Sequence, residues 1–149
     1  MWKNGHDAYL ESRVLSADPV ELVNLLYQAC IQAVRDARYH LERAEIGERS
    51  RAISKACEIL MELNAVLDRE RGGEIAGRLA QLYDYLLGRL LEANIQQSDQ
   101  PLVEVLAILA TLSEGWQGIR TAAPEAVPSG GVWSQQTGQE SAVSHAWSL

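Results

Sequence analysis

The chain has 149 residues, 47% of them hydrophobic, which favours a single domain with one core. Its formal net charge of −7 provides no basic field for phosphates, so nucleic acid and an anionic membrane surface are disfavoured as partners. The longest apolar-rich stretch, Leu102 to Leu112, contains Glu104 and is too short to span a bilayer, and no signal-peptide pattern opens the chain. We therefore expect a soluble protein of the cytosol without direct membrane insertion.

The first of four predicted helices begins with a complete N-terminal signal. Asp18 is a suitable N-cap, Pro19 favours the first helical position, and Glu21 completes a capping box. Apolar residues then recur every three or four positions as far as Leu41, and Gly47 is the expected stop. This pattern predicts one long amphipathic helix.

Three further segments show the same periodicity, and none has the alternation of a strand. They are expected from about residue 50 to the Gly72-Gly73 pair, over 74–94 and over 99–119. Short connections imply antiparallel neighbours, so the sequence predicts an all-α, antiparallel four-helix bundle. The larger residues expected in its core are Leu22, Val23, Leu26, Val34, Leu41, Ile53, Leu60, Leu63, Leu67, Ile75, Leu79, Leu82, Tyr83, Leu86, Leu90, Leu102, Val105, Leu109, Leu112 and Trp116.

The composition divides the chain into three parts: an N-terminal arm over 1–17, the bundle over 18–120 and a C-terminal tail over 121–149. The tail is rich in Ser, Gly and Gln, has no Lys or Arg, and is expected to be disordered. Its two tryptophans, Trp133 and Trp147, are either tolerated aromatics or docking points, and the sequence leaves both readings open.

No catalytic, cofactor or metal site is expected. A di-iron bundle needs glutamate three residues before histidine on two helices, and none of the three histidines has it. Glu58 and Glu62 lie four residues apart but on the face opposite the core stripe, as solvated acids do. Gly72-Gly73 lacks the lysine of a phosphate loop. Cys30 and Cys57 lie among apolar residues at helical spacing, which is typical of reduced, buried thiols.

Apolar residues outside the core stripes suggest a surface for a partner. On the second helix Ile59 and Val66 form an additional line with Leu63 between it and the stripe. The pattern fits equally a groove for a partner's amphipathic helix and a core wider than one stripe. The other residues expected to contact a partner are Leu25, Ile31 and Tyr85, together with Tyr9, Leu10 and Val14 of the arm, which is expected to cover part of the groove as a movable cap.

Several blocks, in order from residue 8 to 119, resemble the FliS family of flagellar secretion chaperones. Ala8-Tyr9 and Val14 precede the most specific opening block, and Trp116 matches a late tryptophan of that family. The tail has no counterpart that aligns, and Asp18 stands where the family often has serine, an exchange between two good N-caps. The blocks that carry the resemblance are Ser16-Ala17-Asp18-Pro19, Glu62-Leu63-Asn64, Gly72-Gly73-Glu74-Ile75-Ala76 and Leu82-Tyr83-Asp84-Tyr85.

The resemblance implies an antiparallel four-helix bundle that acts as a chaperone in flagellar secretion. Such chaperones bind the C-terminal region of flagellin in the cytoplasm, prevent its premature polymerisation and help deliver it to the flagellar type III export apparatus. A non-catalytic protein with these two partners is therefore expected. The alternative is a structural, homo-oligomeric helical bundle without a flagellin client, and weak homodimerisation is left open in either case.

Overall fold

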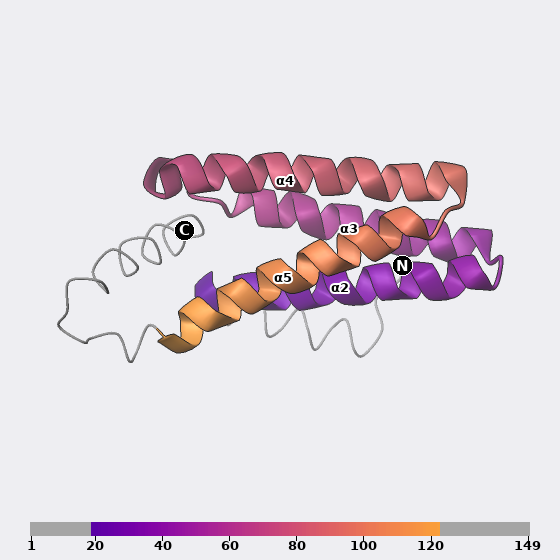
Figure 1. Cartoon of the computed structure of the whole chain (residues 1–149), viewed down its shortest axis with the longest axis horizontal. Helices are drawn as coiled ribbons and strands as arrows, with labels where there is room; N and C mark the ends of the chain where they lie inside the picture. The colour runs from indigo at the N-terminus through magenta and orange to yellow at the C-terminus, as the bar shows by residue number, and fades with distance from the viewer. Residues whose placement is uncertain (1–18, 123–149) are drawn as a thin grey trace.

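The computed structural model describes residues 19–122, which form four helices and no strand (Figure 1). They are α2 (Pro19–Glu42), α3 (Ile46–Ala65), α4 (Arg69–Gln96) and α5 (Gln100–Ala122), joined by connections of three residues each. The predicted helical bundle is confirmed. The arm, the Asp18 cap and the tail lie outside the described residues.

The four helices form a ring in which α3 and α5 are the neighbours of both α2 and α4. Short connections reverse the chain direction after each helix. The contact of Trp116 with Val20 at one end and of Asp99 with Arg38 at the other shows that α5 runs antiparallel to α2. In Figure 1, α5 crosses the bundle obliquely and diverges from α4 toward its C-terminal end.

The turn after α2 differs from the prediction. Gly47 lies in the first turn of α3, and the reversal is made by Ala44, whose φ is 59°. The Ala44 N–H donates to the Leu41 carbonyl at 3.1 Å and the Glu45 N–H to the His40 carbonyl at 2.9 Å, the pattern of a Schellman C-cap. The glycine was a misleading signal because an alanine takes the left-handed position that glycine usually fills.

The glycine pair 72–73 is a kink within α4. Asp68 caps the helix by accepting from the Arg71 N–H at 3.0 Å, so α4 begins at Arg69, ahead of the predicted start. Gly73 then leaves the helical conformation, with φ 54° and ψ −127°. The predicted start at Glu74 is therefore the point at which the regular helix resumes.

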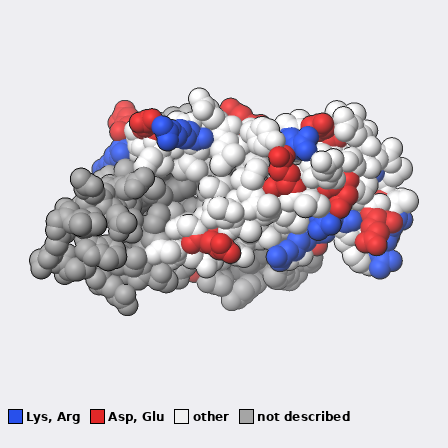
Figure 2. Space-filling model, in the orientation of Figure 1, with Lys and Arg blue, Asp and Glu red and all other residues white. Residues whose placement is uncertain are grey.

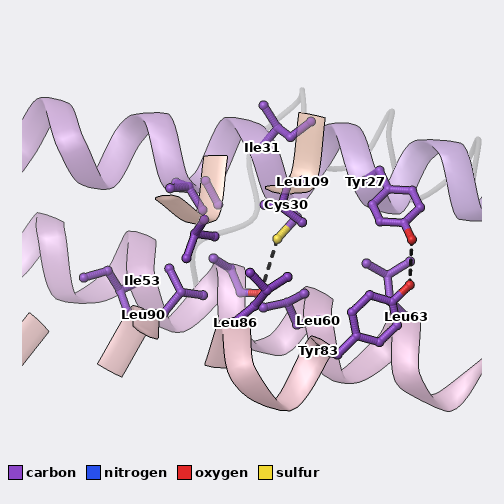
Figure 3. Close-up of a cluster of buried hydrophobic side chains, with 14 of the residues drawn as sticks. Tyr27, Cys30, Ile31, Ile53, Leu60, Leu63, Tyr83, Leu86, Leu90 and Leu109 are labelled. Carbon is purple, nitrogen blue, oxygen red and sulfur yellow. Dashed lines mark hydrogen bonds between the residues drawn. The ribbon is translucent and has the colours of Figure 1, made fainter. Parts of the chain in front are cut away.

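The core follows the predicted stripes closely. A hydrogen bond of 2.6 Å joins the hydroxyls of Tyr27 and Tyr83 across the bundle, from α2 to the diagonally opposite α4 (Figure 3). Burial raises the pKa of Tyr27 well above its usual value, so this phenol stays neutral. Seven of the residues expected in the core are only half-buried: Leu22, Leu26, Leu41, Ile75, Leu79, Leu82 and Leu112. The fully buried large side chains are Tyr27, Tyr83, Ile53, Leu60, Leu63, Leu86, Leu90, Leu102, Leu109, Val23, Val34 and Val105.

Both cysteines are free thiols, as predicted. Cys30 is buried and its Sγ donates to the Ala56 carbonyl at 3.7 Å, whereas Cys57 is half-buried. Burial raises the pKa of the Cys30 thiol to about 12, which leaves it protonated and unreactive in the folded bundle.

Candidate partner-binding surface

Two of the residues expected on a partner surface lie in the core. Leu63 is fully buried and Ile31 is only 7% exposed. In Figure 3, Cys30 points toward α3 and α4, while Ile31 points away from them on the other side of α2. A helix with neighbours on two sides buries two faces, so the expectation that Ile31 lies outside the core is wrong. Leu63 was expected both in the core stripe and beside the partner surface, and it is buried in the core.

The additional line on the second helix has the same explanation. Ile59 and Val66 are half-buried and pack against the core cluster, because α3 also has two neighbours, α2 and α4. Of the two readings that the sequence left open, the wider core is the one that the structure favours here. Leu25 is half-buried on α2, Tyr85 is 46% exposed on α4, and Tyr9, Leu10 and Val14 lie outside the described residues.

An apolar hollow lies between α4 and α5, with a volume of about 370 Å³. Leu82 of α4 and Ala107, Ile108, Thr111 and Leu112 of α5 line it. Ala107 and Thr111 are small, so the diverging helices leave space that larger side chains would fill. On the face seen in Figure 2, charged side chains lie toward the right and at the upper left, and the surface between these two groups is largely uncharged. We call the apolar recess lined by these five residues the α4–α5 hollow.

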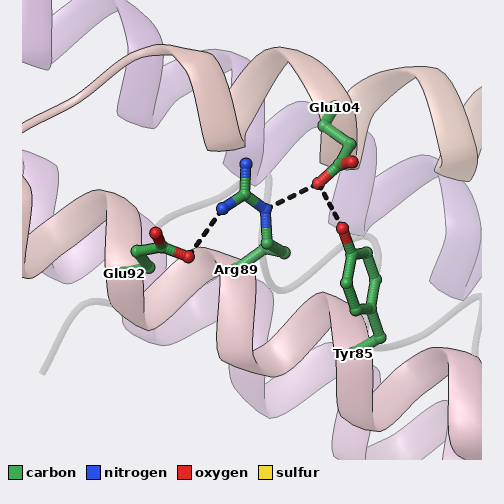
Figure 4. Close-up of polar contacts among 4 residues, drawn as sticks. All are labelled: Tyr85, Arg89, Glu92 and Glu104. Carbon is green, nitrogen blue, oxygen red and sulfur yellow. Dashed lines mark hydrogen bonds and ion pairs between the residues drawn. The ribbon is translucent and has the colours of Figure 1, made fainter.

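A polar cluster lies between α4 and α5 one helical turn from the hollow (Figure 4). The Tyr85 hydroxyl donates to Glu104 Oε1 at 2.8 Å, and Arg89 Nε donates to the same oxygen at 2.6 Å. Arg89 also contacts Glu92 at 2.6 Å. The hydrogen bonds from Tyr85 and Arg89 hold the pKa of the Glu104 carboxyl below its usual value. Glu104 is four residues before Ile108, so the cluster bounds the hollow on the side of the α4–α5 connection.

The seam between α5 and α2 is fastened along its length by polar contacts. The Trp116 indole N–H donates to the Val20 carbonyl at 3.0 Å, and Gln28 donates to the Ser113 hydroxyl at 2.9 Å. At the other end Arg38 makes two hydrogen bonds to the Asp99 carboxylate, at 2.8 and 2.9 Å. These contacts hold α5 to α2, so the space left by its oblique course opens on the α4 side.

A second apolar area occupies the end of the bundle where α3 begins and α4 ends. Ile95 is 81% exposed, and Leu91 and Ile46 are exposed as well. The buried Arg49 joins the two helices there by donating to the Asn94 side chain at 3.1 Å. Sequence reasoning missed this area because it expected the helix to begin after Ile46 and placed no weight on Leu91 and Ile95.

Within residues 19–122 no group of three or more His, Cys, Asp and Glu side chains is arranged to hold a metal ion. In the same part of the chain, no helix combines the length and apolar character needed to cross a membrane.

Comparisons with known proteins agree on one family. The sequence model described as "Flagellar protein FliS" matches residues 2–123. The chain is 40% identical over 111 residues to the flagellar secretion chaperone FliS of Salmonella typhimurium, a match that covers 74% of this chain and 82% of that protein. It is 42% identical over 110 residues to the flagellar secretion chaperone FliSB of Pseudomonas aeruginosa, covering 74% and 87%. The match to FliS of Bacillus subtilis is 30% over 131 residues, covering 87% and 97%.

These relatives bear the names of chaperones and not of enzymes, and the family match spans the whole described bundle. The chain belongs to the FliS family of flagellar secretion chaperones.

Proposed function

We propose that this protein is a cytosolic export chaperone that binds the C-terminal region of flagellin. Bound flagellin is kept from polymerising prematurely and is delivered to the flagellar type III export apparatus. Membership of a family of flagellar secretion chaperones supports the role. The observation that carries the binding step is the α4–α5 hollow, an apolar recess open to solvent.

The hollow suits an amphipathic helix of the client. Such a helix would place one apolar side chain against Leu82 and Ile108 and the next along its length toward Tyr85. The phenol ring of Tyr85 adds apolar area, while its hydroxyl stays bonded to Glu104. Leu25 is accessible on α2, so a longer client segment could also reach it, whereas Ile59 and Val66 serve the core.

The client is expected to fold as it binds. Flagellin's terminal segment is disordered before assembly in this proposal, so binding should combine a negative heat-capacity change with a large ordering cost. Circular dichroism should show more helix in the mixture than the sum of the separate proteins, and calorimetry should show the heat-capacity change. Saturable binding without any gain of helix would contradict this coupled folding.

A pair of substitutions on α4 tests the location. Leu82→Asp places a charge in the hollow at a position that is half-buried and outside the packed core cluster. We expect it to weaken flagellin binding by roughly 1–3 kcal/mol, or about 5- to 150-fold. Gln81→Asp, next to it but exposed, introduces the same side chain outside the hollow and should bind like the unmodified protein. Equal affinities of the two variants would place the client elsewhere.

The arm residues Tyr9, Leu10 and Val14 stay a prediction. In the proposed function they cover the client surface when it is empty, so deleting residues 1–15 should leave the bundle folded, increase self-association and tighten flagellin binding. Loss of binding in this variant and in Tyr9→Ala would make the arm a direct client contact.

The alternative, a homo-oligomeric structural bundle, draws on the exposed area at Ile46, Leu91 and Ile95, which a second copy could cover. Sedimentation of the purified chain would then show a dimer that Ile95→Glu dissociates and Gln96→Glu does not. A monomer at all concentrations would remove this alternative.

A further inference from the structure

The α4–α5 hollow and the C-terminal tail have complementary properties. The family match ends at residue 123, so residues 124–149 of the tail lie outside it. Residues 123–149 contain Trp133 and Trp147, only two acids, and no Lys or Arg. The hollow is lined by four apolar side chains and a threonine, and it is open to solvent. The tail thus contains two aromatic side chains with large apolar surfaces, and the bundle has an apolar recess without an occupant among residues 19–122.

We propose that the tail folds back on its own bundle and docks a tryptophan in the α4–α5 hollow. The occupant is the segment 133–147 of the same molecule. This inference concerns the chain alone and does not depend on a flagellin client.

The tail is long enough to reach. Thr111 lies 11 residues before the end of α5, so the hollow is about 16 Å back along the helix from Ala122. The 11 residues 123–133 can span up to about 35 Å when extended. Trp133 therefore reaches the hollow with slack, and Trp147 does so more easily. The polar cluster of Tyr85, Arg89 and Glu104 bounds the hollow on the other side, so the approach is from the C-terminal end of α5, where the tail departs.

The chemistry of both sides favours contact. An indole ring has a large apolar surface, and a recess of about 370 Å³ falls in the range of pockets that hold small apolar groups. The hydroxyl of Thr111 already donates to the Ala107 carbonyl at 3.0 Å, so it does not require a further partner when water leaves. Tethering the segment to α5 also gives it a high effective concentration, which compensates in part for the entropy of ordering it.

Photo-crosslinking in the full-length chain tests the proposal. A benzophenone amino acid replaces Trp133 in one variant, Trp147 in a second and Gln136 in a third, and mass spectrometry locates the crosslinked peptide. We expect a crosslink from position 133 or 147 to a peptide that contains Leu82 or residues 107–112, formed within one molecule. Position 136 should crosslink less to these peptides.

A matched pair of alanines on α5 supplies the control. Ala107 lines the hollow and Ala110 does not, while both are exposed, so glutamate at either position leaves the core intact. Ala107→Glu should lower the crosslink yield about tenfold or more, because the indole would have to dock beside a charge. Ala110→Glu should leave the yield unchanged. Equal yields in the two variants, crosslinks to other helices, crosslinks between two molecules, or no crosslink to the bundle would each overturn the proposal.

Discussion

At the residue scale, the core contains a buried pair of tyrosines, Tyr27 and Tyr83, whose hydroxyls must be hydrogen-bonded to be buried without a large cost in free energy. Two phenolic hydroxyls lie among apolar side chains and meet at 2.6 Å, one from each of two diagonally opposite helices. A hydroxyl taken out of water costs free energy unless it is bonded, so each tyrosine fits because the other is present. The pair thereby fixes the relative position of α2 and α4.

A double-mutant cycle tests this pairing. Tyr27→Phe or Tyr83→Phe alone should lower the free energy of unfolding by about 1–3 kcal/mol, because the remaining buried hydroxyl loses this hydrogen bond. The double variant should lose less than the sum of the two, since no hydroxyl is then left in the centre. Urea unfolding measures all four states. Strict additivity would show that the two hydroxyls do not stabilise one another.

Glu104 predicts a dependence of stability on pH. Its pKa in the folded chain is held below the usual 4.5 by hydrogen bonds from Tyr85 first and Arg89 second. A carboxyl of this kind contributes stability above its ordinary pKa, and the contribution is lost as the pH falls through the lower, folded value. The loss should therefore begin near pH 4.5 and continue below it.

Carbon-detected NMR titration of the Glu104 carboxyl gives the measurement. Tyr85→Phe removes the larger cause, so it should move the pKa of Glu104 back toward 4.5 and make the chain less sensitive to acid in this window. An unchanged titration in that variant would assign the shift to Arg89 alone.

At the scale of elements, α4 contains a backbone strain point that only glycine tolerates well. Gly73 has φ 54° and ψ −127°, a region that L-residues rarely adopt. Gly73→Ala should therefore lower the free energy of unfolding by about 1–3 kcal/mol, although the added methyl would meet no atom within 4 Å. Thermal or urea unfolding measures the change.

Gly77 is the matched control, because it lies one turn later in the same helix with helical geometry and open space around it. Gly77→Ala should raise the free energy of unfolding by about 0.5–1 kcal/mol through better helix propensity. The two substitutions are thus predicted to change the free energy of unfolding in opposite directions. A stabilising effect at Gly73 would contradict its assigned role.

The sequence predicted elements well where local chemistry decides them. The start of the last helix at residues 99–101 and the stripes that contain Ile53, Leu60 and Leu86 follow directly from capping and periodicity. It failed at Ala44, because a left-handed alanine has no composition signal. It also misjudged Ile31, because the number of buried faces on a helix depends on how many neighbours it has, which is a property of the assembled bundle.

At the scale of the whole molecule, the candidate surface was beyond sequence reasoning for a similar reason. Leu82 and Leu112 were placed in the core, and Ala107 and Thr111 attracted no attention. They form one hollow only because α5 crosses obliquely and is held to α2 by contacts such as that of Trp116 with Val20. Tyr85 was expected outside the core stripe and is 46% exposed, but its hydrogen bond to Glu104 of α5 depends on that same crossing.

The tail and the proposed client would then compete for one hollow, with a measurable consequence. Deleting residues 123–149 removes chain beyond the last helix, so the melting temperature should change little. Flagellin binding should nevertheless become tighter, because a chaperone whose site is free for only a fraction of the time has its dissociation constant raised by the inverse of that fraction. If the tail is docked half the time, deletion tightens binding about twofold.

The matched control replaces residues 123–149 by a Gly/Ser sequence of equal length, which keeps the bulk of the tail and removes Trp133 and Trp147. Competition by docking predicts that this variant binds as tightly as the deletion, since the tryptophans and not the length occupy the hollow. If it instead binds like the unmodified chain, the tail hinders the client by its excluded volume. If both variants bind more weakly, the tail contacts the client directly. Titration calorimetry on the three proteins separates these outcomes, because the docked tail must also be displaced, and the heat of that displacement is absent from both variants.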